Sequence, residues 1–313
     1  MISVVIPAYN AARFIGETLD SVLAQTFQDF EIVIIDDGST DSTIDIIREY
    51  QKKDDRIRLI QNAHGGPSIA RNTGVEAAKY DWIALVDADD LCLPERFEKQ
   101  IKAIESDPEV IVWATYVYNI GPNGEVQGTT ELGPRSKEHF HKLRQQGEKI
   151  YIRNSSATLR KDIFLKAGGY DPRFKAGEDL ELWDRLAEYG PIVTIPEPLV
   201  SYRFHDGSIT KYTFDFQMTA ARFIEARNRA RLRGESLEWE EFLEYDTNRP
   251  LPVKIVRFID VNSKRHYRTA SEAISNKRYL PGGMYLALAT VMNPPVMLPR
   301  IWRKLVPQRS SAG

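Results

Sequence analysis

The first third of the chain alternates between short runs of β-branched and apolar residues and longer segments in which apolar residues recur every three or four positions. The short runs are typical of strands buried on both faces, and the longer pattern is typical of helices that pack one face against a sheet. Strands and helices that alternate at these lengths form βαβ units, so the pattern predicts an α/β fold with a mostly parallel sheet. The expected strands are residues 3–6, 31–35, 57–60 and 82–86, and the expected helices are residues 15–23, 42–50, 68–78 and 94–106.

The rest of the chain is less regular, and its character changes near residue 212. Apolar runs before that point predict further strands, and a polar segment at 135–146 predicts a helix. Beyond it, helical patterns dominate to the end. The sequence therefore predicts a domain at 1–212, with halves at about 1–107 and 108–212, and a mainly helical C-terminal region at 213–313. The additional expected strands are residues 110–119, 125–130, 192–195 and 199–204.

Composition and charge exclude several classes of protein. The formal net charge of -2 gives no reason to expect a nucleic-acid partner. The single cysteine, Cys92, cannot form an internal disulfide, which fits a reducing compartment. The first residues lack the basic region of a secretory signal peptide, and no apolar run reaches the ~18 residues of a spanning helix. A cytoplasmic protein is therefore expected.

Polar and acidic residues follow the expected strands at the point where each strand ends, at residues 7–10, 36–39, 64–67 and 87–90. In a parallel sheet these carboxyl ends share one edge, where ligands bind. The last segment contains three carboxylates, and such a cluster favours a bound cation because clustered like charges destabilise one another. Oxygen ligands suit Mg²⁺ or Mn²⁺, and Mg²⁺ commonly binds one or two carboxylates together with substrate phosphates. The sequence thus predicts a metal that holds a diphosphate.

Each of these features also has a simpler interpretation. Residues 36–39 by themselves resemble a turn that leads into a helix, and the acids at 87–90 would suit the start of the helix after Pro94. Arg71, on the helix expected at 68–78, either faces the acidic edge or is an ordinary surface arginine. The chain contains neither a P-loop nor a dinucleotide-binding glycine motif, so a nucleotide has to bind in another way.

The segment GEDLELWDRL at residues 177–186 predicts a helix with Leu182, Trp183 and Leu186 on its buried side. Asp179 lies three and four residues before the first two, so it shares their face. An acid in the first turn of a helix is stabilised by the helix dipole, which is the simpler explanation. An acid that faces inward at the mouth of a core helix is also a good candidate for a general base.

Seven stretches of the sequence together resemble the family 2 glycosyltransferases, which have the GT-A fold. They occur in the order typical of the family within about residues 1–210 and read VVIPAYN, QTFQDFEIVIIDDGSTD, GGPSIARNTG, DWIALVDADD, AGGYDPRF, GEDLELWDRL and YRFHDGS. Each is a weak signal alone, and seven in order are a strong one. The resemblance implies a Rossmann-like GT-A sheet, a nucleotide-diphosphate-sugar donor, a divalent metal (Mg²⁺ or Mn²⁺) and transfer with inversion at the anomeric carbon.

The resemblance also implies roles for individual residues. Asp37 is expected to bond the edge of the nucleobase, and Arg71 to lie beside the nucleotide. Asp87 and Asp89 form the D-x-D motif of the family, with Asp89 as the direct metal ligand, and Asp179 matches the catalytic base. The other expected site residues are Pro7, Tyr9 and Asn10 in the nucleotide pocket, His205 as a metal or phosphate ligand or else a structural residue, and Glu178 and Trp183 on the acceptor side.

Processive members of the family have a Q-x-x-R-W motif and membrane-spanning helices, and this sequence has neither, so a synthase of long polymers is not expected. The alternative enzyme, a sugar nucleotidyltransferase, needs a glycine-rich basic loop where this chain has residues 7–10. A non-catalytic sugar-nucleotide-binding protein is a third possibility, although Asp89 and Asp179 are both present.

The sequence says less about the identity of the substrates than about the type of reaction. The expected donor is a UDP- or dTDP-sugar, because Asp37 can accept a hydrogen bond from a pyrimidine N–H. The expected acceptor is a glycan or a lipid-linked hydroxyl, in the synthesis of a polysaccharide, a glycolipid or another glycoconjugate.

The end of the chain is apolar and basic. The apolar run at 284–292 is too short to span a bilayer, which takes about 20 residues. Further on, Ile301, Trp302 and Leu305 share a helical face that is bordered by basic residues, and no acid occurs from residue 296 to the end. Such a helix either packs on the catalytic domain or lies on an anionic membrane surface. The sequence does not separate these two, and the resemblance favours the membrane, because many glycosyltransferases of this kind act on lipid-linked acceptors. Peripheral contact with the cytoplasmic face of a membrane is therefore expected through residues 296–313.

Overall fold

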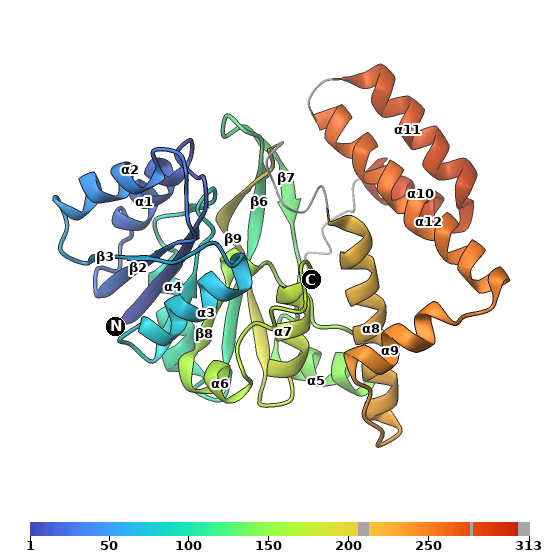
Figure 1. Cartoon of the computed structure of the whole chain (residues 1–313), viewed down its shortest axis with the longest axis horizontal. Helices are drawn as coiled ribbons and strands as arrows, with labels where there is room; N and C mark the ends of the chain where they lie inside the picture. The colour runs from blue at the N-terminus through green and yellow to red at the C-terminus, as the bar shows by residue number, and fades with distance from the viewer. Residues whose placement is uncertain (206–212, 276–277, 306–313) are drawn as a thin grey trace, which may run out of the picture. The chain divides into compact units, whose positions relative to one another are not determined.

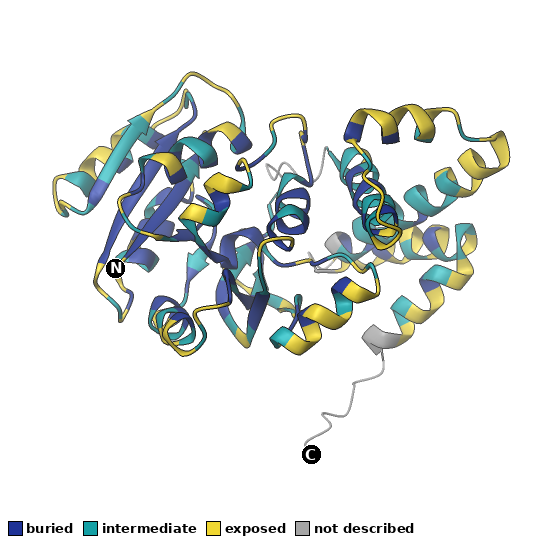
Figure 2. Ribbon diagram, turned by 90° about the horizontal axis from the view of Figure 1, so that it is seen from below, coloured by how far each residue is buried: buried dark blue, intermediate teal, exposed yellow. Residues whose placement is uncertain are grey.

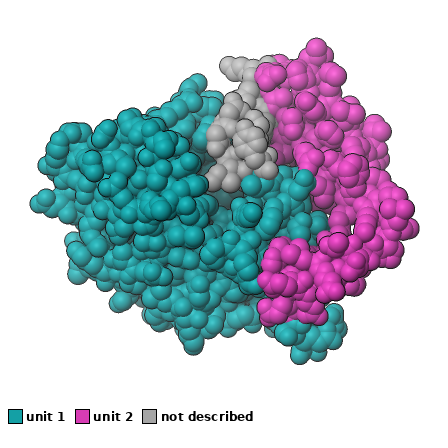
Figure 3. All heavy atoms as spheres, viewed as in Figure 1, with its two compact units in different colours: residues 1–236 teal, residues 237–313 magenta. Residues whose placement is uncertain are grey.

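The computed structural model describes residues 1–205, 213–275 and 278–305, without the side chains of residues 272, 275 and 303–305. The chain forms two compact units, residues 1–236 and residues 237–313, which Figure 3 colours separately. The first unit extends beyond residue 212 because α8 (Phe214–Leu232) packs against α7 (Glu178–Leu186).

Within the described residues the first unit contains one nine-stranded sheet, in the order β3-β2-β1-β4-β8-β6-β9-β5 with β7 paired to β6. The first four strands are all parallel, as the sequence predicts. The first, second and fourth strands are almost wholly buried, as the dark blue ribbons in Figure 2 show, which explains their continuous apolar runs, whereas the third strand, at the edge of the sheet, is mostly half-buried. These strands are β1 (Ile2–Ala8), β2 (Phe30–Asp36), β3 (Ile57–Gln61) and β4 (Trp82–Leu85).

The second half of the sheet mixes parallel and antiparallel pairs. The strands expected at 192–195 and 199–204 are one strand, β9 (Ile192–Arg203), and that expectation of two strands is wrong. The pairing of β9 with β6 (Val112–Ile120) shifts register between Thr115 and Tyr116, which face Ile195 and Pro198. The polar residues between the two expected strands therefore form a bulge and do not end the strand. The other strands of this half are β5 (Leu91–Cys92), β7 (Val126–Thr130) and β8 (Thr158–Arg160).

Helices cover both faces of the sheet (Figure 1). Alternate residues of β1 enter different cores: Val4 belongs to the core that contains residues of α1, α2 and α4, and Val5 belongs to the core that contains residues of α3, α5, α6 and α7. Helix α3 lies so close to the sheet that a Cβ on Gly74 would be 2.5 Å from side-chain atoms of Val5 and Ile35. The helices not yet given are α1 (Ile15–Leu23), α2 (Thr43–Gln51), α3 (Pro67–Ala77), α4 (Arg96–Ser106), α5 (Lys137–Gln145) and α6 (Lys161–Lys166), with a 3₁₀ turn at Asn154–Ser156.

The second unit is helical, as the sequence predicts for this end of the chain. It contains α9 (Trp239–Thr247), α10 (Leu251–Ser275), α11 (Tyr279–Met292) and α12 (Pro294–Leu305). Helices α10 and α11 run side by side, and α12 contacts both (Figure 1). Among the described residues, the helices are all too short or too polar to cross a bilayer.

Candidate active site

The loops after β1, β2 and β4 meet at one edge of the sheet. Ala8 and Asp36, the last residues of β1 and β2, are paired in register, and the amide of Asp37 donates to the carbonyl of Ala8 (2.8 Å). Strand β4 pairs with the other side of β1, so the acidic segment 87–90 follows at the same edge. The structure thus brings together the segments that the sequence placed at a shared ligand site.

On the β1–β2 side of this edge, the ring of Tyr9 stacks on the ring of His64 with their centroids 4.3 Å apart. The Nδ1 atom of His64 lies 2.9 Å from Oδ2 of Asp37. The Asp37 carboxylate also accepts from the amides of Gly65 (2.8 Å) and Gly66 (2.9 Å). Two of the expected nucleotide-pocket residues are therefore neighbours through His64, to which sequence analysis gave no role of its own.

Asn10 and Pro7 shape this edge through the backbone. Asn10 has a left-handed backbone (φ 48°), and its Oδ1 accepts from the amide of Thr40 (2.8 Å). Its own amide donates to Oγ of Ser39 (2.9 Å). Pro7 is still part of β1, opposite Ile35. Asn10 therefore connects the loop after β1 to the loop after β2.

Arg71 is a buried residue, so its interpretation as an ordinary surface arginine is wrong. Its side chain donates to Asp87 (2.9 Å) and to Glu178 (3.1 Å), and its guanidinium lies 5.4 Å from the centre of the Tyr170 ring. This pair of contacts connects the end of β4 to the first turn of α7. Glu178, which was expected on the acceptor side, thus forms an ion pair with Arg71.

Asp89 contacts His205, the histidine expected near the metal. Their Oδ2 and Nε2 atoms are 2.8 Å apart, and the His205 ring packs on Phe14. Among the described residues there is no cluster of three His, Cys, Asp or Glu side chains that would hold a metal. A carboxylate and an imidazole are suitable ligands for Mn²⁺ or Mg²⁺, and such ions take their remaining ligands from water and substrate phosphates. The two residues therefore fit a cation that binds together with a diphosphate.

Asp90, the third acid of the cluster, is buried, and its carboxylate binds groups of the protein itself. It accepts from the hydroxyl of Ser155 and from the amide of Arg203 (2.8 Å). Burial and the charges of Asp89 and Asp87 raise its pKa well above the usual range of a carboxyl. The Arg203 side chain in turn donates to the carbonyl of Asp89 (2.8 Å). Asp90 and Arg203 thus hold the end of β9, two residues before His205, against the acidic loop.

Asp179 lies in the first turn of α7. Burial and the neighbouring Glu178 charge raise its pKa to about 6, although the amide of Leu180 (2.7 Å) and the charges of Arg71 and Arg153 oppose the shift. A carboxyl with this pKa is mostly ionised at pH 7 and still basic enough to accept a proton.

Trp183 is fully buried in the core between the sheet and α7. In this structure it therefore shapes the helix and does not face an acceptor. Sequence analysis assigned no role to Arg153, which interacts with the proposed base. The charge of Arg153 lowers the pKa of Asp179, and the Arg153 guanidinium lies 4.6 Å from the centre of the Tyr202 ring. Arg153 precedes a short 3₁₀ turn with no periodic pattern, so nothing in the sequence singled it out.

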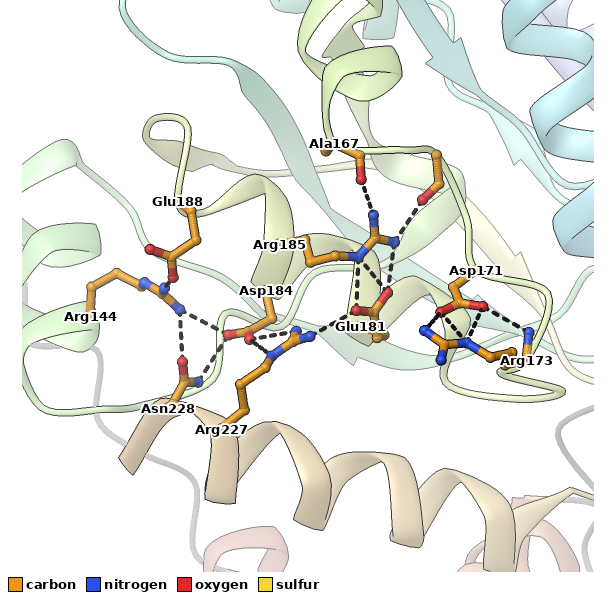
Figure 4. Close-up of polar contacts among 11 residues, drawn as sticks. Arg144, Ala167, Asp171, Arg173, Glu181, Asp184, Arg185, Glu188, Arg227 and Asn228 are labelled. Carbon is orange, nitrogen blue, oxygen red and sulfur yellow. Dashed lines mark hydrogen bonds and ion pairs between the residues drawn. The ribbon is translucent and has the colours of Figure 1, made fainter. Parts of the chain in front are cut away.

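Helix α7 is fixed by a network of charged side chains, which Figure 4 shows. Its centre is Asp184, which is buried and accepts from Arg144 (2.8 Å), Arg227 (2.7 Å) and Asn228 (2.9 Å). The Arg227 guanidinium also donates to Glu181, one turn earlier on the same helix (2.9 Å). Helices α5 and α8 are therefore joined to the helix that bears Asp179.

We expect Asp184→Asn to lower the free energy of unfolding by roughly 3–5 kcal/mol, because it removes the buried carboxylate that pairs with both Arg144 and Arg227, which Glu188 and Glu181 replace only in part. Urea denaturation measures this loss. The matched control is Asp171→Asn, which breaks the solvent-accessible pair of Asp171 with Arg173 (2.7 Å) shown in the same figure. The control should cost at most about 1 kcal/mol. Equal losses in the two variants would show that the network does not stabilise the fold.

A mostly parallel sheet with helices on both faces and acidic loops at its carboxyl edge places the chain in the GT-A-like class of α/β folds. Residues 3–167 match the sequence family "Glycosyl transferase family 2". The chain belongs to this family, and it is a glycosyltransferase.

Two relatives illustrate the match. Glycosyltransferase GlyG of Streptococcus pneumoniae is 36% identical over 232 residues, which cover 69% of this chain and 74% of the relative. An uncharacterized glycosyltransferase of Methanocaldococcus jannaschii is 32% identical over 207 residues, which cover 65% of this chain and 70% of the relative. The family match sets aside the sugar nucleotidyltransferase alternative.

Solved structures share the fold. A fragment of TarS from S. aureus (residues 1–349), crystallised with UDP, superposes with a TM-score of 0.58 at 19% identity, and the match covers 98% of this chain and 93% of that fragment. The mannosyltransferase PcManGT of Pyrobaculum calidifontis, crystallised with GDP-Man and Mn²⁺, gives a TM-score of 0.53 at 17% identity, with coverages of 97% and 79%. At these identities the likeness concerns the fold.

Proposed function

We propose that this protein is an inverting, metal-dependent, non-processive glycosyltransferase that moves a sugar from a nucleotide-diphosphate-sugar to an acceptor hydroxyl. The main support is the position of Asp179, a half-buried acid whose pKa is raised to about 6. Its neighbour Glu178 is joined through Arg71 to Asp87 of the acidic loop. The proposed base and the proposed diphosphate site thus belong to one connected set of side chains.

In the proposed reaction Asp179 accepts the proton of the acceptor hydroxyl while the hydroxyl oxygen attacks the anomeric carbon. The bond from that carbon to the diphosphate oxygen breaks, and the diphosphate leaves with the bonding electrons. Attack opposite the leaving group inverts the anomeric configuration. Positioned general-base catalysis of this kind contributes ~10²–10⁴-fold to the rate.

Asp89 and His205 would hold the divalent cation, Mg²⁺ or Mn²⁺. When bound, it would neutralise charge that develops on the departing diphosphate, an effect worth several kcal/mol. The observation that supports this is the 2.8 Å contact of the two side chains at the edge that Asp87 also borders. The structural neighbour that contains Mn²⁺ agrees with the proposal.

We expect UDP and dTDP to bind more tightly than GDP. Asp37 still has lone pairs that can accept from the N–H of a pyrimidine ring, and the Tyr9–His64 pair offers a flat surface beside it. In a thermal-shift screen with Mn²⁺, a ligand that binds only the native state raises the melting temperature. UDP-sugars and dTDP-sugars should give the largest shifts, with ADP as the control nucleotide.

The structural neighbours differ in their nucleotides: TarS was solved with UDP and UDP-GlcNAc, and the mannosyltransferase with GDP-Man. Calorimetry that finds GDP bound much more tightly than UDP would overturn the pyrimidine preference. It would leave the proposed reaction untouched.

We also propose that the acceptor is a glycan or a lipid-linked hydroxyl, and that the protein works in the cytoplasm with peripheral membrane contact. Trp302, on the tail that the sequence singled out, is highly exposed in α12. The side chains of residues 303–305 and all of residues 306–313 lie outside the described residues, so most of the basic border of this tail does as well.

A further inference from the structure

Helix α11 has its large apolar residues on the outside. Leu280, Met284, Leu288 and Val291 are spaced by four, four and three positions, so they form one stripe along the helix. Their exposed fractions are 80%, 62%, 49% and 79%. Four large apolar side chains in a row on one exposed face are unusual for a helix that faces only water.

The opposite side of α11 is built from small residues that pack against α10. Gly282 and Ala289 are buried there. A Cβ on Gly282 would lie 2.5 Å from Cγ1 of Ile274, so the two helices approach too closely for a larger residue. Small residues between helices and large apolar residues outside are the arrangement that helices adopt when their outer face meets lipid.

The stripe of α11 carries no charge, and α10 exposes large apolar residues as well. No residue of α11 is charged. In the first two turns of α10, Leu251, Val256 and Phe258 are exposed by 69%, 68% and 66%. The stripe of α11 and these three residues are together called the α10–α11 surface below.

The surrounding sequence is strongly basic. Residues 249–313 contain twelve Lys and Arg but only two acids, Asp260 and Glu272, although the whole chain has a net charge of -2. Two of the basic residues are exposed: Lys254 in the first turn of α10 and Arg278 directly before α11. The acids of the same unit that lie outside this range precede α10, and Asp246 among them pairs with Arg257 (2.7 Å). Exposed apolar helices with basic residues beside them are complementary to anionic lipid headgroups above an acyl layer.

We propose that the α10–α11 surface docks onto an anionic lipid bilayer, with α11 lying in the plane of the interface. The 14 residues of α11 extend only about 21 Å, less than the ~30 Å of a bilayer core, so the helix does not span. A second copy of the chain is a poorer occupant, because the two positive regions would repel each other. The proposal is independent of the transfer chemistry and of the tail at 296–313.

The first experiment is flotation of the full-length protein with vesicles. It should float with vesicles that contain phosphatidylglycerol and remain behind with pure phosphatidylcholine. Replacing the four stripe residues by glutamine should lower the apparent partition coefficient by ~10-fold or more. Lys254→Gln and Arg278→Gln should each lower it about fivefold. The stripe variant combines Leu280→Gln, Met284→Gln, Leu288→Gln and Val291→Gln. A separate variant, Trp302→Gln, tests the tail.

The matched control is the double variant Val126→Gln/Leu165→Gln, which removes exposed apolar side chains from the first unit and should float like the wild type. Equal binding to both kinds of vesicle, or full binding by the stripe variant, would overturn the proposal. So would a dimer that the stripe variant dissociates, since a second copy would then cover the surface.

A second measurement avoids any dependence on the folding of the stripe variant. The only native cysteine, Cys92, is buried, so a single introduced cysteine can be labelled selectively with a polarity-sensitive dye. A dye on Val291→Cys should shift to the blue when anionic vesicles are added, and a dye on Leu165→Cys should not. An unshifted dye at residue 291 in protein that floats would place the membrane contact elsewhere.

Discussion

Replacing Asp179 by asparagine should lower kcat by about 10²- to 10⁴-fold, while binding of the donor changes little. Asparagine keeps the size of the side chain but cannot accept the acceptor proton. Because the pKa of Asp179 is about 6, activity of the wild type should fall as the pH drops through 6 and the base becomes protonated. Initial rates between pH 5 and pH 8, together with calorimetry of donor binding, measure both effects.

The neighbouring acid supplies a matched control. The Glu178 charge raises the pKa of Asp179, and Glu178 also pairs with Arg71. In Glu178→Gln the like charge is gone, so the acidic limb of the pH profile should move to lower pH while substantial activity remains. If Asp179→Asn turns over as fast as the wild type, Asp179 is only a residue at the start of α7.

Removing the Asp89 carboxylate should abolish detectable transfer and weaken donor binding. In Asp89→Ala the cation loses its carboxylate ligand, and the diphosphate loses its counter-charge. Chelation of the wild-type protein with EDTA should have the same effect, and Mn²⁺ or Mg²⁺ should restore activity. The measurements are product formation and calorimetric titration of the donor with and without metal.

His205→Ala tests the second proposed ligand. If both residues hold the cation, this variant should need more Mn²⁺ for half-maximal activity, whereas a purely structural His205 would leave the metal requirement unchanged. Full wild-type activity in EDTA would remove the metal from the proposal while leaving the family assignment and the role of Asp179 intact.

The candidate site shows where sequence patterns stop being informative. The segments at 7–10, 36–39 and 87–90 could be placed at one edge because parallel strands necessarily end on the same side. The sequence could not predict the roles of the individual acids in the segment at 87–90. Asp87 pairs with Arg71, Asp89 contacts His205 and Asp90 holds the amide of Arg203. Such partners are distant in the sequence, so no spacing reveals them.

Sequence alone determined the parallel half of the sheet, the helices that cover it, the helical C-terminal end and the inward face of α7. These features follow from local periodicity, because burial on one or both faces fixes which positions are apolar. Tertiary structure alone decided the mixed half of the sheet, where β5 and β8 are two and three residues long and too short to show a period. It also decided that Arg71 and Asp184 are buried among opposite charges, and that the large residues of α11 face outward. In each of these cases the deciding energy comes from contacts between distant segments.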